Sequence, residues 1–313
     1  MQNVNAEHIV LHQHVTIETL KTHEPLKNHK YLHKNIPEYP KEVEFQISKV
    51  SHVTNKAGLD GILMSDGFKG GQRRGPFMWW GLNIEDSLIK DAENRYLDRE
   101  IPIRHSSSAQ PEKSQVSFLK KFTTSPVFQK GSRYGNFKFT FPLEDLMQMY
   151  TEQICGGEKP VLRVHQTVVY QQEIMYAVVV HSPKVTEFDE CPLLEGAKAM
   201  CSYRDGTIVW NAQAVSETHN YELIREHNKI KAKKVRKGTH QFFVWDHVTL
   251  AFHMPDDTAL HADRKDLIES LKACDSVQPL YRKEDAVMSL ERAAIIVENV
   301  PRIVQTGSNQ QKT

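Results

Sequence analysis

The stretch from Ser51 to Phe68 constrains the fold more than any other part of this 313-residue chain. Apolar and polar residues alternate over 43–47 just before it, which is the period of a strand with one buried face. Apolar residues at helical spacing over 59–63 follow, before a glycine that suits a helix end. The sequence therefore predicts a strand that delivers His52 and Thr54 to a turn, and a helix that leads away from it.

Composition narrows the class of protein but not its function. Hydrophobic residues make up 39% of the chain, enough for a substantial core, and the formal net charge of +1 gives no overall bias toward nucleic acid or membranes. The longest apolar run, 174–180, is far shorter than the roughly 20 residues that span a bilayer. The four cysteines form no CxxC pair: Cys155, Cys191, Cys201 and Cys274. We therefore expect a cytoplasmic or nuclear protein that is not secreted, has no membrane partner and holds no metal.

Two later stretches supply residue types that suit a site beside His52. Residues 118–126, which include the Phe-Thr-Thr-Ser segment 122–125, are expected to form a strand that stops at the proline, and Tyr134 follows it. Flat aromatic side chains such as these stack on heteroaromatic rings. A second strand is expected over 173–181, and Gln171 and Glu173 stand at its start.

In this order, the three stretches resemble the ADP-ribosyltransferase fold, in the branch that includes the poly-ADP-ribose polymerases. The resemblance covers about residues 45–182. It implies that the substrate is NAD, that its nicotinamide glycosidic bond is cleaved, and that ADP-ribose is transferred to an unknown protein or nucleic-acid acceptor. Val53 stands where the family has glycine, a small residue that lets the backbone approach the ligand closely.

The resemblance also implies a role for each matching residue. His52 and Thr54 would hold the adenosine ribose and the nicotinamide side of NAD, and Ser125 would brace the first strand. Phe122 and Tyr134 would sandwich the nicotinamide ring. Glu173, spaced as Gln171-x-Glu173, would bond the nicotinamide ribose and stabilise its positive charge as nicotinamide leaves. On this hypothesis Glu173 and His52 are catalytic, and the other residues bind the cofactor: His52 (in both roles), Thr54, Phe122, Ser125, Tyr134 and Gln171.

The predicted architecture is α+β, with mixed, mostly antiparallel sheets, an ADP-ribosyltransferase-like core and C-terminal helices. Residues 1–40 form a polar, histidine-rich N-terminal arm, which is read either as a metal-binding tract or as a loosely ordered segment. Residues 41–183 form the transferase-like domain, within which 69–117 is an insert of unexplained role. A β-rich extension with helices occupies 184–304, and 305–313 is a tail.

A second His-x-Thr motif supports a different enzyme class. Residues 246–252 read Asp-His-Val-Thr-Leu-Ala-Phe, and a strand there would project His247 and Thr249 from one face. This motif resembles the two-histidine phosphoesterase and RNA-ligase-like family, in which paired His-x-Thr strands supply a general acid and a general base. On that reading, His52 and His247 act together on an RNA end or a cyclic phosphate.

Structural explanations without a catalytic site remain open for each motif. His52 also suits a hydrogen-bonded histidine at a strand end, and Glu173 an exposed residue at a strand start. A third hypothesis is a non-catalytic nucleotide- or protein-binding module with the same fold, which Val53 favours. The basic run 229–237 suits either phosphate binding or a solvated hairpin, and the aromatic run 76–80 suits the core.

Overall fold

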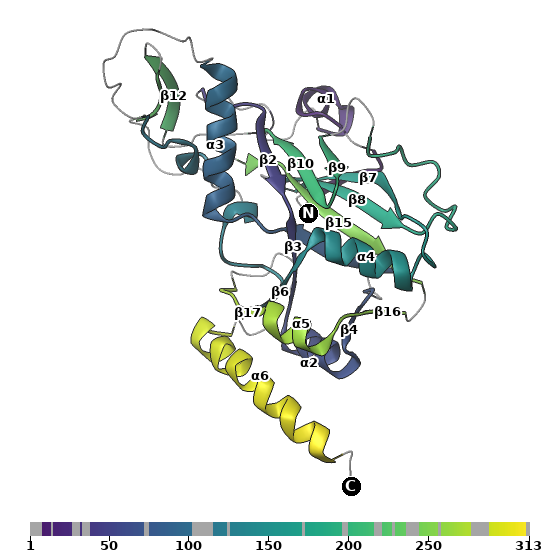
Figure 1. Ribbon diagram of the computed structural model, residues 1–313. Coiled ribbons are helices and arrows are strands. Elements are labelled where there is room, and N and C mark those ends of the chain that lie inside the picture. Colours follow the sequence, from purple (N-terminus) through teal and green to yellow (C-terminus); the bar gives the residue numbers. More distant parts are fainter. Residues whose placement is uncertain are drawn as a thin grey trace, which may run out of the picture.

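The computed structural model describes residues 8–310 apart from thirteen gaps. The residues outside the description are 1–7, 14, 27–31, 33–37, 72–74, 102–114, 124–125, 171–172, 196–199, 216–220, 227–228, 236–243, 256–257, 277–287 and 311–313. The described part is a mixed α+β fold whose sheets are mostly antiparallel, as the sequence predicts. Its framework is one eight-stranded sheet with helices around it (Figure 1).

Eight strands from across the chain build the large sheet. In spatial order they are β1 (His8–Leu11), β7 (Val161–Tyr170), β8 (Glu173–His181), β15 (His247–His253), β5 (Phe77–Leu82), β3 (Lys49–Thr54), β6 (Phe137–Pro142) and β17 (Leu271–Ala273). Neighbouring strands are antiparallel except for β8 and β15, which are parallel. This sheet takes strands from both sides of residue 183, so the predicted boundary there does not separate two folding units.

Shorter strands pair around this framework. They are β2 (Val43–Ile47), β10 (Thr207–Ala212) and β9 (Cys201–Arg204) in one sheet, β4 (Gly67–Lys69) with β16 (Ala259–His261), β11 (Ala214–Val215) with β14 (Val244–Trp245), and β12 (Tyr221–Glu226) with β13 (Lys229–Lys234). The helices are α1 (Ile17–Thr22), α2 (Lys56–Ser65), α3 (Asp86–Glu100), α4 (Leu143–Gln153), α5 (Arg264–Ser270) and α6 (Leu290–Gln310), with 3-10 turns η2 (Glu24–Leu26), η3 (Leu119–Lys121) and η4 (Pro126–Phe128).

The two faces of the large sheet differ in chemistry. The core face carries Val50, Trp80, Phe139, Leu250 and Val178, all fully or almost fully buried. It is covered by α4, β4 and the β2-β10-β9 sheet. Edge-to-face ring contacts join Tyr150 of α4 to Phe252 and Phe68 of β4 to Phe139, with centroids 5.1 and 5.3 Å apart. The reverse face carries a row of small and polar residues that the strand registers align: Thr140, Ser51, Gly81, Thr249 and Ala177.

Two further sequence predictions need correction. The segment from Phe118 to Phe122 is not a strand: it forms the 3-10 turn η3, because Glu93 of α3 accepts hydrogen bonds from the amides of Phe118 and Leu119. The described part of the N-terminal arm is not a separate segment either. It contributes β1 to the large sheet, and several of its apolar side chains, including Val15 and Leu20, are buried in the core.

Candidate functional site

The large sheet opens between β3 and β5, at the strand end that carries His52. These strands pair at only two positions, Val50 with Leu82 and Ser51 with Gly81, whereas β3 pairs with β6 along its whole length. Beyond Ser51 the two strands are no longer hydrogen-bonded to each other by their backbones. This interruption of the backbone pairing, called the opening below, is the candidate site, and β3 stays joined to β5 through Val50 and Ser51.

His52 bridges the opening with its side chain. Its Nδ1 lies 2.9 Å from the carbonyl oxygen of Trp79, and because a carbonyl only accepts, Nδ1 carries the proton and donates. The ring lies against Phe68 and Trp80, with centroid distances of 5.5 and 5.6 Å. Burial lowers the pKa of His52, and the hydrogen bond to Trp79 opposes this more weakly. The ring is therefore neutral at pH 7, and Nε2 is left as a hydrogen-bond acceptor.

Thr54 lies where β3 gives way to α2, and two glycines allow this packing. A Cβ atom at Gly58 would lie 1.8 Å from Oγ1 of Thr54, so that hydroxyl lies directly over the first turn of α2. A Cβ atom at Gly135 would lie 2.1 Å from the carbonyl oxygen of Thr54. The segment that contains Tyr134 therefore runs against the end of β3, and the Tyr134 side chain is 54% exposed there. His52, Thr54 and Tyr134 thus belong to one end of the sheet.

The other predicted site residues lie elsewhere or outside the description. Phe122 is fully buried at the end of η3, and its ring centroid is 6.4 Å from that of Tyr221 in β12. The backbone of Glu173 begins β8, three strands away from β3 and four residues before Ala177, which aligns with Ser51. Strand spacings place it roughly 20 Å from His52. Ser125 and Gln171 fall outside the described residues. The structure does not bring Phe122 or Glu173 to His52.

The two His-x-Thr motifs lie on opposite faces of the sheet. Thr249 aligns with Ser51 through Gly81, so Thr249 and His247 project from the reverse face. His52 pairs with Phe139 and projects from the core face. Because the sheet lies between the two imidazoles, they cannot act on opposite sides of one phosphate, as the two-histidine hypothesis requires.

Comparison with known proteins adds no identity. No known family model matches the chain, and no curated protein and no solved structure resembles it detectably. The described helices include none that is long and apolar enough to cross a membrane. Within the same described residues, no group of three or more His, Cys, Asp or Glu side chains is arranged to hold a metal ion.

Sequence reasoning missed the aromatic residues that contact His52. Trp79 supplies the carbonyl acceptor, and Phe68 and Trp80 contact the ring. The sequence predicts that the aromatic run 76–80 belongs to the core, which is correct for Trp80. Its relation to His52 depends on the pairing of β3 with β5, which the chain order does not show.

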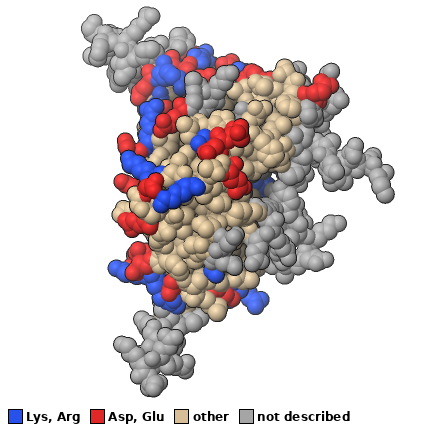
Figure 2. All heavy atoms as spheres, turned by 90° about the vertical axis from the view of Figure 1, so that its right-hand side faces the viewer, with Lys and Arg blue, Asp and Glu red and all other residues tan. Residues whose placement is uncertain are grey.

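The basic run of β13 is largely neutralised by its own hairpin. Lys231 lies 2.7 Å from Glu226, and Lys233 lies 3.4 Å from Glu222 on the paired strand. Acidic and basic atoms also intermingle along the molecular face in Figure 2, without an extended field of one sign among its described residues. These pairs favour a solvated hairpin over a phosphate-binding surface.

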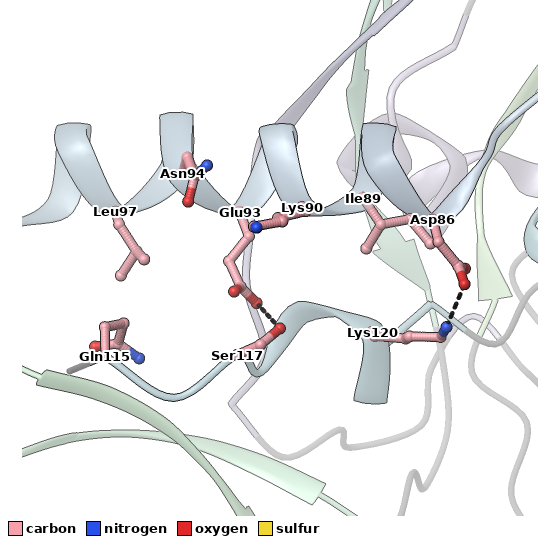
Figure 3. A pocket seen from close by; sticks show the side chains of 9 residues that line it. All are labelled: Asp86, Ile89, Lys90, Glu93, Asn94, Leu97, Gln115, Ser117 and Lys120. Atoms are coloured by element: carbon pink, nitrogen blue, oxygen red, sulfur yellow. Dashed lines mark hydrogen bonds and ion pairs between the residues drawn. The ribbon is translucent and has the colours of Figure 1, made fainter.

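A pocket between α3 and residues 115–120 has a structural explanation. Figure 3 shows Glu93 pointing from α3 toward Ser117, while Asp86 pairs with Lys120 at 2.7 Å. Oε2 of Glu93 accepts from the amides of Phe118 and Leu119 at 2.7 and 2.5 Å. None of the predicted site residues lines this pocket.

Replacing Glu93 by alanine is therefore expected to destabilise the fold. The two buried amides would lose their charged acceptor, at a cost of about 2–4 kcal/mol in the free energy of unfolding. Chemical denaturation of Glu93→Ala and of the conservative Glu93→Gln, which keeps one acceptor oxygen, measures this. Equal stability of Glu93→Ala and the wild type would contradict a structural role.

Proposed function

We propose that this protein is an ADP-ribosyltransferase-like protein that binds NAD at the opening between β3 and β5. The observation that carries the proposal is the position of the His52 ring, whose Nδ1 lies 2.9 Å from the carbonyl oxygen of Trp79 across the opening. Its Nδ1 is committed to the Trp79 carbonyl, so Nε2 can accept a hydrogen bond from a sugar hydroxyl. That is the kind of role that the resemblance assigns to this histidine, which would hold the adenosine ribose.

Thr54 and Tyr134 support the same site. The end of β3, where Thr54 lies, is held against the residues that follow Tyr134, so both side chains belong to the rim of the opening. An exposed tyrosine ring at such a rim offers a flat surface to a base or to nicotinamide. We propose the ADP-ribosyltransferase-like core together with these ligand contacts, and the NAD titration below tests both.

The position of Glu173 favours a second form of the proposal, in which the protein binds the nucleotide without transferring ADP-ribose. Catalysis by a carboxylate requires that it lie beside the ribose as positive charge develops. Glu173 begins a strand at the far end of the sheet from Thr54. Val53 also favours binding without transfer of ADP-ribose. It stands where the family has glycine, and its side chain occupies space beside the opening.

Isothermal titration of the purified protein with NAD tests the binding proposal. The variant His52→Phe keeps the ring contacts with Phe68 and Trp80 but removes both nitrogens. We expect it to weaken NAD binding by about tenfold or more, the effect of losing one buried hydrogen bond. His261→Gln, at an exposed histidine of β16, is the control and should bind as the wild type does. Equal binding by His52→Phe, or no binding by the wild type, would refute the proposal.

Incubation of the protein with labelled NAD distinguishes the catalytic form of the proposal from the non-catalytic form. Transfer or hydrolysis that is lost in Glu173→Gln would support the catalytic form with the residue named by the resemblance. Binding without turnover by the wild type would support the non-catalytic form.

A further inference from the structure

The pocket between α3 and residues 115–120 is large enough to hold a small ligand. Its volume is about 240 Å³. Sites for drug-sized ligands occupy roughly 300–1,000 Å³, so this pocket suits a small molecule rather than a nucleotide. Figure 3 shows the side chain of Glu93 reaching across the pocket from α3 toward Ser117. Glu93 is therefore the charged group that a ligand in the middle of the pocket would meet.

The two oxygens of the Glu93 carboxylate have different surroundings. The residue is only 5% exposed. Oε2 accepts from the hydroxyl of Ser117 at 3.2 Å and from the amides of Phe118 and Leu119. Oε1 accepts no hydrogen bond from the residues that the structure describes, and it faces the part of the pocket beside Leu97 (Figure 3). Because a carboxylate accepts through both oxygens, Oε1 is available to a donor that enters the pocket.

The lysines that line the pocket do not neutralise Glu93. Lys120 pairs with Asp86 at 2.7 Å, at the end of the pocket away from Leu97 (Figure 3). Lys90 lies about one turn before Glu93 on the same helix and is exposed, but it makes no ion pair with a carboxylate in the described part of the chain. The negative charge of Glu93 is therefore met only by one hydroxyl and two amides.

We propose that this pocket binds the ammonium group of a small alkyl amine. An ammonium ion donates three hydrogen bonds, and it accepts none. Three oxygens that line the pocket can accept them: Oε1 of Glu93, the amide oxygen of the exposed Asn94, and Oγ of Ser117, whose own proton goes to Oε2. Ile89 and Leu97 supply an apolar wall for the methylene groups of the amine.

The single available oxygen of Glu93 favours an ammonium group over a guanidinium group. A guanidinium ion pairs best with a carboxylate through two parallel hydrogen bonds, one to each oxygen. Since Oε2 already holds the backbone of Phe118 and Leu119, only Oε1 remains for a ligand. A compact ammonium ion needs no second oxygen. None of the residues proposed to bind NAD lines this pocket, so the amine site does not depend on the proposed function.

An NMR titration of the full-length protein with n-butylamine tests the site, with the amide signals of Phe118 and Leu119 as the readout. Butylamine is protonated at pH 7, as a lysine side chain is. Glu93→Gln keeps an acceptor for the two amides but removes the negative charge. We expect it to weaken butylamine binding by about tenfold or more, the effect of one charge-assisted hydrogen bond. Asp91→Asn removes an exposed carboxylate of α3 that does not line the pocket, and this matched control should bind as the wild type does.

A second variant keeps the test independent of the stability of Glu93→Gln. Asn94→Asp adds a carboxylate at an exposed position of the pocket and leaves the contacts of Glu93 in place, so it should tighten butylamine binding severalfold. Butylguanidine should bind the wild type more weakly than butylamine does. No binding by the wild type, or equal binding by the wild type, Glu93→Gln and Asn94→Asp, would overturn the amine site. Binding by Lys90→Met alone would also overturn it, because Lys90 itself would then occupy the pocket.

Discussion

Replacing Gly135 by alanine is expected to lower the free energy of unfolding by about 3 kcal/mol or more, one of the largest single-residue effects in this protein. Its φ is +142°, which side chains rarely adopt, and a Cβ atom would lie 2.1 Å from the Thr54 carbonyl oxygen and 2.5 Å from the Asn55 nitrogen. These neighbours are backbone atoms, which cannot move aside without displacing β3 and the start of α2. Chemical denaturation measures the change.

Two further glycine substitutions distinguish the effect of a positive φ from the effect of a steric clash. Gly157→Ala tests positive φ alone, because its φ is +90° but no atom lies within 4 Å of its added Cβ; it should cost about 1 kcal/mol. Gly58→Ala meets the Thr54 hydroxyl at 1.8 Å, so Thr54→Ala should restore much of its stability. The same Thr54→Ala change should not rescue Gly135→Ala. If Gly135→Ala were no more damaging than Gly157→Ala, the close packing of this segment on β3 would be wrong.

Acidification from pH 7 to pH 5 is expected to destabilise the protein through a cluster of histidines on the reverse face. Phe188, from the loop after β8, lies among three imidazoles: the ring centroids are 5.9 Å from His165, 5.1 Å from His181 and 5.2 Å from His253. Phe77 completes the cluster at 6.0 Å. Charging any of these rings would place a cation in an apolar environment.

The direction of the change in stability with pH follows from the pKa shifts of the histidines. Burial lowers the pKa of His165, which His12 reinforces and Glu187 opposes. Burial also lowers the pKa of His181; the Ser182 carbonyl and Asp189 oppose this, while Arg163 and His253 add to it. The unfolded chain binds protons near pH 6.5, above both folded pKa values, so stability is lost as the pH falls below about 6.5. Each histidine contributes at most about 1.4 kcal/mol per pH unit.

Thermal unfolding of the wild type and His181→Gln across pH 5–8 measures this dependence. The variant should show a shallower loss of stability at low pH, because one proton-binding group is removed from the unfolded state. His261→Gln, at an exposed position, should keep the full slope. Stability that is constant from pH 7 to pH 5 would show that the cluster does not carry this effect.

Local sequence signals predicted the pieces that depend on neighbouring residues alone. The alternation before His52 and the helix that follows Thr54 correspond to β2, β3 and α2. Asn55 caps α2 by accepting from the amide of Gly58, an interaction within one turn. Such elements form wherever periodicity and capping agree. The mixed α+β class follows from the same signals.

Long-range contacts overrode the local pattern at other places. Residues 118–122 have the composition of a strand, yet Glu93, 25 residues earlier, binds their amides and shapes a 3-10 turn. The polar beginning of the chain has no strong pattern of its own, yet β1 pairs with β7 at the edge of the large sheet. The two strands are more than 150 residues apart in the chain. Single-sequence patterns do not contain partners at these separations.

The candidate site likewise depends partly on local sequence and partly on long-range contacts. The sequence by itself determined that a strand would deliver His52 and Thr54 to the start of a helix, because alternation, capping and helical spacing are local properties. Only the tertiary structure decided which residues meet there. Strand order placed Trp79 and Lys138 beside His52 and Val53 and kept Glu173 away. Phe122 lies at the end of η3, which Glu93 of α3 holds in place. Register also put His247 on the opposite face, since moving one residue along a strand reverses the face that a side chain occupies.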